Sequence, residues 1–529
     1  MKTQSRALRL GLVLFVVGAF TGQAAAAPNV EAGQAPPGVV TASTGGMQRL
    51  GKLTLSSGSY SGLYSAVIDL VNGYAYFATA NSINPGWVIK VNIQGPLPVE
   101  VGAVAVQPGE YNLDVGVIDV AAGYAYFGTT ASPGKVVKIA LGAGNNPPTY
   151  VGSLTLNAGE DSTWGAVIDP ANGYAYFATN TTPGRVVKVA LGAGSALPTR
   201  VSALTLNAGE DHIRRAVIDA ANGYAYFATA GTTPKVVKVA LGAGNAAPTR
   251  VGAVTLDPVT PYNIGSAVID PANGYAYFGT YDVAASRVPA KVFKVAPGAG
   301  NAAPTLVGAL TLNAGERELS TAVIDPASGY AYFGTDHTYP AKIFQIKLGT
   351  GAALPTETGV LQLQGGTQPN PPDGQNKINN PETLYGEVYL QSAVIDPARG
   401  YAYFGTDSNH GQVVKVALPS VPVADLRVTN AITATGTLTA TLAWTPPSSA
   451  VTTTLRYSDT LITEANWASA LTVTDTLTGT AIYTATITPH NGGTIYFALK
   501  TQDGTGAYSV LSNNAFWPRW DVHLPLVTK

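Results

Sequence analysis

The sequence predicts an all-β protein in which a seven-bladed β-propeller, closed by an N-terminal strand, is followed by a β-sandwich. Three observations predict this fold. The string Gly-Tyr-Ala-Tyr-Phe occurs seven times along the chain, most often at intervals of 50 residues. The 59 glycines and 36 prolines are typical of short strands joined by tight turns. A strand of the Leu-Thr-Leu type precedes the first repeat and is missing after the last.

The repeat that begins at Val201 indicates how each unit folds. We expect four strands, at Ala216 to Asp219, Tyr224 to Thr229, Lys235 to Leu241 and Arg250 to Leu256. A hairpin turn joins the first two, and the Asp before it is expected to accept the turn's own N–H groups. The third strand is rich in valine and apolar on both faces, so it needs cover on both sides. Neighbouring blades supply this cover in a propeller, and a solenoid is the structural alternative.

The offset between the repeats and the Leu-Thr-Leu strands distinguishes these two architectures. Residues Arg49 to Leu55 supply such a strand before the first hairpin, and none follows Leu418. If the N-terminal strand completes the last blade, whose other strands lie between Ser392 and Leu418, all seven blades are complete. A solenoid would require atypical capping units. We therefore expect a closed propeller over residues 49–420.

The two ends of the chain indicate export. Three basic residues precede an apolar run from Leu10 to Phe20 and a group of small residues, which together are typical of a secretory signal peptide over residues 1–27. A retained membrane anchor is the alternative, although the run is short for a bilayer span. We expect a linker over residues 28–48, a tail over residues 518–529, and no transmembrane segment in the mature chain. The expected location is secreted or at the cell surface.

Charge and cysteine content exclude several kinds of partner and site. The chain has 30 Lys and Arg against 31 Asp and Glu, and charged residues make up only 12% of it. Without a basic cluster it lacks the surface that releases counterions from nucleic acid, so we expect no nucleic-acid partner. The absence of cysteine excludes disulfides and thiolate metal sites.

Two resemblances to known families follow from these motifs. The unit Ala-Val-Ile-Asp-Pro-Ala-Asn-Gly-Tyr-Ala-Tyr-Phe-Gly-Thr resembles the repeats of YVTN-type and lactonase-like propellers, over about residues 49–418. Residues 421–517, with Trp444 before two prolines and Tyr496 in a late strand, resemble a fibronectin type III sandwich. The first resemblance implies a fold and not an activity, because such propellers include both enzymes and binding proteins.

Candidate ligand-binding residues stand where the repeat is broken, because a scaffold position recurs and a ligand position need not. After the common Phe-Gly-Thr, the later repeats continue with Asp and His, whereas the earlier ones have Ala, Thr or Asn. A histidine also enters the same predicted face from the fourth repeat. Carboxylate and imidazole groups can bind ligands or transfer protons. The expected ligand-binding residues are Asp282, Asp336, His337, Asp407, His410 and His212.

Five glutamates recur nine positions before the turn Asp, in the loop that enters the innermost strand. A ring of carboxylates at a channel mouth could bind Ca²⁺, which prefers oxygen ligands. In the alternative interpretation, each Glu bonds local backbone N–H groups or pairs with Arg or Lys. No other cofactor is expected. The candidate metal ligands are Glu110, Glu160, Glu210, Glu316 and Glu387.

The first functional prediction is an exported, non-enzymatic binding or scaffold protein of the bacterial cell surface. No nucleophile elbow, zinc-binding His-Glu-x-x-His, P-loop or dinucleotide fingerprint is present in the sequence. The predicted partner of the propeller loop face is a cell-surface protein or a glycan, and we expect a monomer. The alternative is a lactonase- or lyase-like hydrolytic enzyme with its site on the loops of blades five to seven. A structural surface-array protein is a third hypothesis.

Overall fold

The computed structural model describes most of the chain after residue 45. The described residues are 30–32, 46–80, 85–231, 233–257, 262–282, 288–365, 386–408, 410–419, 426–434, 436–444, 450–463, 466–477, 482–490, 492–503, 509, 512 and 514–517. The predicted signal peptide and tail, and most of the predicted linker, lie outside them. Among the described residues no helix is long and apolar enough to cross a membrane.

The first part of the chain is all-β and consists of repeated antiparallel sheets, most of them four-stranded, which is consistent with a propeller. The first strands are β3 (Leu63–Asp69), β7 (Val115–Asp119), β11 (Thr163–Asp169), β15 (Ile213–Asp219), β19 (Tyr262–Asp270), β23 (Leu319–Asp325) and β27 (Leu390–Asp396). The second strands are β4 (Tyr74–Thr79), β8 (Tyr124–Gly128), β12 (Tyr174–Thr179), β16 (Tyr224–Thr229), β20 (Tyr275–Asp282), β24 (Tyr330–Thr335) and β28 (Tyr401–Thr406).

The outer strands follow in the same order. The third strands are β5 (Trp87–Asn92), β9 (Lys135–Ala140), β13 (Arg185–Ala190), β17 (Lys235–Ala240), β21 (Lys291–Ala296), β25 (Lys342–Lys347) and β29 (Gln412–Ala417). The fourth strands are β6 (Val99–Ala105), β10 (Thr149–Thr155), β14 (Thr199–Thr205), β18 (Thr249–Thr255), β22 (Thr305–Thr311) and β26 (Thr356–Gln362). Beside β29 lies β2 (Gln48–Thr54), followed at the edge by β1 (Val30–Ala32). In the repeat analysed above, the first strand begins three residues earlier than predicted.

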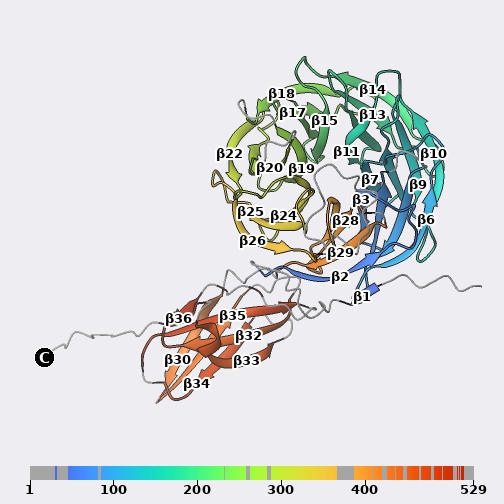
Figure 1. The fold of residues 1–529 in the computed structure, drawn as a ribbon. Coiled ribbons are helices and arrows are strands. Elements are labelled where there is room, and N and C mark those ends of the chain that lie inside the picture. The colour runs from blue at the N-terminus through green and yellow to red at the C-terminus, as the bar shows by residue number, and fades with distance from the viewer. Residues whose placement is uncertain are drawn as a thin grey trace, which may run out of the picture.

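These sheets are arranged around a common centre, as Figure 1 shows. Each first strand contacts the first strand of the next sheet, from β3 and β7 through to β23 and β27, and β27 also contacts β3. Strand β2 pairs antiparallel with β29, with Leu53 opposite Val413. The innermost residues of all these sheets therefore face one central space.

The repeated Asp residues have the structural role that the sequence predicts. In each hairpin, a carboxylate oxygen of the Asp accepts a hydrogen bond from the backbone N–H of the residue three positions later in the turn. These residues are Asp69, Asp119, Asp169, Asp219, Asp270, Asp325 and Asp396. The prediction that these seven carboxylates stabilise turns is confirmed.

Buried polar side chains join each sheet to the next. The hydroxyl of Tyr176, which is 1% exposed, donates to the carbonyl of Leu241 in the following sheet at 3.0 Å. In the same seam the ammonium of Lys188 lies 4.3 Å from the centre of the Tyr174 ring. It donates to the carbonyls of Leu241, Gly242 and Ala246. The Gly-Ala-Gly loop thus surrounds a lysine that would otherwise be costly to bury.

The C-terminal part of the chain forms two further antiparallel sheets over one core. The strands are β30 (Arg427–Ala434), β31 (Thr437–Ala443), β32 (Ala450–Ser458), β33 (Leu471–Leu477), β34 (Ile482–Ile487), β35 (Ile495–Asp503) and β36 (Ala515–Trp517), with a short 3-10 helix, η2 (Trp467–Ser469). The sheet orders are β30-β31-β34 and β33-β32-β35-β36. Trp444 is buried in the core that residues of both sheets share.

Candidate functional site

A polar cavity of about 210 Å³ opens at the centre of the ring of sheets. Its lining comes from the position five residues before each turn Asp, a position that carries a different amino acid in every repeat. These residues are Tyr64, Asp114, Trp164, Arg214, Gly265, Ser320 and Gln391. A second cavity of about 220 Å³ continues along the first strands and shares several of these residues.

A β-bulge directs most of these side chains toward the centre. In six of the first strands the pairing register shifts across this position, as between Ile213 and Arg215 or between Thr163 and Gly165. The residue that the register skips is left unpaired, and bulges re-aim side chains next to active sites. The scaffold is thus constant, while the side chain that it points into the cavity varies.

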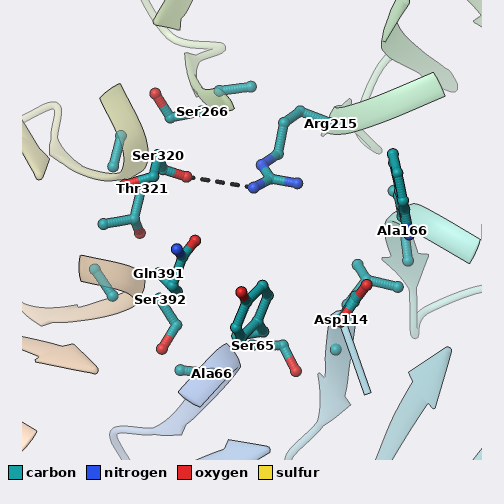
Figure 2. Close-up of a pocket in the computed structure, with 18 of the residues that line it drawn as sticks. Ser65, Ala66, Asp114, Ala166, Arg215, Ser266, Ser320, Thr321, Gln391 and Ser392 are labelled. Carbon is teal, nitrogen blue, oxygen red and sulfur yellow. Dashed lines mark hydrogen bonds between the residues drawn. The ribbon is translucent and has the colours of Figure 1, made fainter. Parts of the chain in front are cut away.

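Two arginines form the basic side of the cavity. The Arg215 guanidinium donates to the carbonyls of Gly265 at 2.5 Å and Ser320 at 3.3 Å, and so spans two neighbouring sheets. Figure 2 shows Arg215 reaching toward Ser320, with Asp114 directed into the same space. The Arg214 guanidinium stacks 4.5 Å from the centre of the Trp164 ring. Burial lowers the pKa of Arg215 to about 10, and the neighbouring Arg214 charge acts in the same direction.

Asp114 carries a carboxyl group whose pKa is strongly shifted by its surroundings in the cavity. Burial raises its pKa from 3.8 to about 7, although Arg215 and Arg214 act in the opposite direction. Its Oδ1 is buried without a hydrogen-bond partner in the part of the chain that the structure describes. The same is true of Trp164 Nε1 and Arg214 Nε, which line the same cavity. Buried polar atoms are normally paired, so three unpaired ones around one cavity indicate the place of a ligand.

One of the predicted ligand residues lines this cavity, and a second one bonds a residue that lines it. Asp336, which is 1% exposed, lines it and accepts a hydrogen bond from the Tyr281 hydroxyl at 2.8 Å. Asp407 is also buried and accepts a hydrogen bond from the hydroxyl of Tyr64 at 3.0 Å. Burial, more than these carboxylates, raises the pKa of both tyrosines well above the ordinary value of 10.0. Both hydroxyls therefore remain protonated donors at neutral pH.

His337 lies beside this group, and the structure does not bring His410 or His212 into it. His337 Nδ1 is 3.3 Å from Asp336 Oδ2. His410 Nδ1 lies 3.2 Å from the carbonyl of Leu55, near the start of the chain's repeated part. The exposed ring of His212 is bonded to Asn180 and Thr182. Asp282 ends β20, and its side chain lies outside the described residues.

The five candidate metal ligands do not form one site. Glu160 pairs with Arg200 at 2.6 Å, Glu210 with Arg250 at 2.6 Å, and Glu387 with Arg49 at 2.5 Å. Glu110 bonds Tyr150 and Ser153, and Glu316 lies 3.6 Å from Lys342. Burial opposes the ionisation of Glu160, but Arg200 and the Asn157 N–H hold its pKa below the ordinary value. No group of three or more metal-ligating side chains occurs among the described residues.

Apart from Asp336, the sequence analysis did not select the side chains that line the cavity. Tyr64, Asp114, Trp164, Arg214 and Gln391 stand at one repeat position, and a column-by-column comparison of the seven repeats would have singled it out. The predicted ligand residues came from the loops instead, because the alternating pattern of a strand does not show that a bulge directs the residue at this position toward the centre.

Comparison with known proteins gives only distant likenesses. No protein-family model and no curated protein matches the chain. A solved structure from Bacteroides uniformis, described as a 6-phosphogluconolactonase, is 12% identical and covers 60% of this chain and 95% of its own, with a TM-score of 0.48. A solved structure of the same description from Bacteroides fragilis is 13% identical and covers 56% of this chain and 82% of its own, with a TM-score of 0.46. The periplasmic gluconolactonase of Pseudomonas aeruginosa is 10% identical and covers 57% and 85%, with a TM-score of 0.46.

These findings correct the first functional prediction. We expected a non-enzymatic binding or scaffold protein, whereas three of the solved structures that the chain resembles are described as lactonases. The likenesses are too distant to carry an activity to this chain, so the function has to be argued from its own residues.

Proposed function

We propose that this protein is a hydrolase of small cyclic esters and that the central cavity is its active site. The observation that carries the proposal is the group of three buried, unpartnered polar atoms, on Asp114, Trp164 and Arg214, around one space. Evenly repeated sheets create the space, and the one variable position in each repeat supplies its chemistry.

Asp114 would act as the general base. A carboxyl group with a pKa of about 7 is partly ionised at neutral pH, which is the range in which proton transfer to and from a base is most effective. It takes a proton from water as the water oxygen attacks the ester carbonyl carbon. The ring C–O bond then breaks, and the departing alkoxide oxygen takes that proton back. The products are the hydroxyl and carboxyl groups of an open-chain hydroxy acid.

Arg214 and Trp164 would stabilise the negative charge that develops on the carbonyl oxygen. Both carry a buried N–H without a partner, and the stacking of the guanidinium on the indole holds these groups in place. Donors that are fixed before the reaction stabilise an oxyanion without reorganisation. Arg215 is committed to backbone carbonyls, so we assign it a positioning role.

The frame of this site is proposed to be a seven-bladed propeller closed by β2. The seam between the last and first sheets repeats the bonds of the other seams, which supports closure. Tyr403 donates to the carbonyl of Ile93, Lys415 to that of Gly95, and Ser392 to that of Leu63. The repeat motifs support a YVTN-type propeller over residues 49–420, and the shared core around Trp444 supports a fibronectin type III-like sandwich over residues 421–517. From the sequence we further propose export with a signal peptide over residues 1–27.

Proton release during hydrolysis tests the proposal. A panel of five- and six-membered lactones of sugar acids and simple hydroxy acids is offered to the wild type and to Asp114→Asn. A matched control is Asp161→Asn, because Asp161 bonds Ser132 on the surface. We expect turnover of at least one lactone by the wild type and the control, and a loss of roughly 100-fold or more in Asp114→Asn. Failure of the wild type to hydrolyse any of them would refute the proposal.

A further inference from the structure

The cavity is connected to solvent by a short chain of closely spaced polar side chains. The Tyr281 hydroxyl group, on a side chain that lines the cavity, donates to Asp336 Oδ2 at 2.8 Å. His337 Nδ1 lies 3.3 Å from the same carboxylate oxygen and 2.5 Å from Glu318 Oε2. Burial changes sharply along this chain, because the Asp336 side chain is 1% exposed and that of His337 is 35% exposed. The chain thus begins inside the cavity and ends at solvent.

The position of His337 is fixed from several sides. Its backbone N–H donates to Glu318 Oε2 at 2.9 Å, and the backbone N–H of Asp336 donates to the Glu318 carbonyl at 3.0 Å. The ring edges of Tyr281 and Tyr389 lie against the imidazole, with ring centres 6.3 and 5.7 Å away. Glu318 and Tyr389 hold left-handed backbone conformations, with φ of 62° and 55°.

The other repeats do not reproduce this arrangement. The position of Glu318 is occupied by Asn112, Ser162, His212 and Tyr389 in four other repeats, each with a similar positive φ. The backbone geometry is therefore common to the fold, while the Glu–His–Asp group occurs in one repeat alone among the described residues. A structural requirement of the loop would not need this particular set of side chains.

We propose that Tyr281, Asp336 and His337 form a proton relay between the central cavity and solvent, with Glu318 as the residue that positions His337. This inference rests on the proposed hydrolytic function. Hydrolysis of a cyclic ester produces a carboxylic acid, which loses one proton at neutral pH, so each turnover must export one proton from the cavity.

The proton balance of the relay is simple. The product's carboxyl proton passes to the Tyr281 oxygen while the Tyr281 proton passes to Asp336 Oδ2. Asp336 transfers it to His337, and the imidazole releases it to water. Each of the three groups then holds as many protons as before, and the product leaves as a carboxylate. Tyr281 is never ionised in this sequence, in keeping with a pKa that burial holds well above its ordinary value.

Buffer rescue of His337→Gln tests the relay. The matched control is His212→Gln, since His212 is an exposed histidine at the position that Glu318 occupies in its own repeat, and it bonds Asn180. The kcat and KM for a lactone are measured at one pH with increasing imidazole, and circular dichroism checks that each variant is folded. We expect His337→Gln to lose roughly 10- to 100-fold in kcat with an unchanged KM, and to recover as imidazole replaces the missing proton carrier. The wild type and His212→Gln should not respond to the buffer.

The outcomes separate the relay from the proposed function. If the wild type is active and His337→Gln has an unchanged kcat, the relay is overturned, whereas the proposed hydrolytic function is not. A slow His337→Gln that imidazole does not restore would also overturn it, because a merely structural role gives that result. A wild type that turns over no lactone would overturn both proposals.

Discussion

Replacing Asp114 by Asn is expected to make the protein more stable at alkaline pH while abolishing the proposed activity. Asp114 is a carboxyl group whose pKa is raised in the folded protein, from 3.8 to about 7, chiefly by burial. The folded state thus favours its protonated form. The associated stability is fully present below the unfolded pKa and is lost as the pH rises through about 7.

The size of the effect follows from the two pKa values. The difference between 3.8 and about 7 corresponds to a free-energy cost of at most about 4 kcal/mol for keeping an ionised Asp114 in the cavity. Asparagine avoids this cost, but it leaves an amide whose unmet hydrogen bonds cost about 1–3 kcal/mol. The net gain in the free energy of unfolding is therefore about 1–3 kcal/mol at about pH 8. It disappears, or reverses, at about pH 4, where the wild-type carboxyl is mostly protonated.

Denaturant titrations of the wild type and Asp114→Asn at these two pH values measure the difference directly. Asp161→Asn serves as the control, since its carboxylate lies at the surface and bonds Ser132. A variant that gains the same stability at both pH values would show that Asp114 does not change protonation between them. A variant that is less stable than the wild type at about pH 8 would show that the ionised carboxylate stabilises the folded state. This result would contradict the assignment of Asp114 as a base with a raised pKa.

Three further predictions concern the scaffold. Burial raises the pKa of Tyr176 and its six counterparts in the folded protein. The folded state should therefore lose stability above about pH 10, where these tyrosines ionise in the unfolded chain but not in the folded one. In denaturant titrations, Tyr176→Phe should make the loss of unfolding free energy at about pH 11 smaller by about 1.4 kcal/mol. Lys188→Met should cost about 3 kcal/mol, because it removes the hydrogen bonds to the buried Leu241 carbonyl and to two partly buried carbonyls. Gln345→Met at the equivalent position of another repeat should cost about 1 kcal/mol or less. Deleting residues 49–55 leaves β29 as an exposed edge strand. The melting temperature of the deletion variant should be lower than that of the wild type, and light scattering should show that the variant associates. Equal melting temperatures of the variant and the wild type would contradict closure of the ring by β2.

Much of the repeated part could be predicted from the sequence because its signals are local and recur. The hairpin turns, the alternation of strands and the turn role of residues such as Asp169 all depend on neighbours within a few positions. The pairing of Leu53 with Val413, at the two ends of the repeated part, could also be anticipated, because it follows from counting strands. These features are fixed by local chemistry and by the number of repeats.

The candidate site could be predicted only in part. Asp336 and Asp407 were selected as departures from the repeat, and the structure places both at or beside the cavity. His410 was selected by the same reasoning and bonds the Leu55 carbonyl instead. Asp114 could not be predicted from the sequence because its burial, which determines how its carboxyl group ionises, is a tertiary property. The buried lysines escaped for a similar reason, since their carbonyl partners belong to the following repeat.

The dependence of kcat/KM on pH for lactone hydrolysis tests the central claim most directly, because it reports the protonation state of the base in the free enzyme. If Asp114 is that base, the value for the wild type rises with pH through an apparent pKa of about 7 and levels off above it. This rise is absent from the residual rate of Asp114→Asn. A wild-type profile that is flat across this range, or one that survives unchanged in Asp114→Asn, would contradict the assignment of the central cavity as a hydrolytic site.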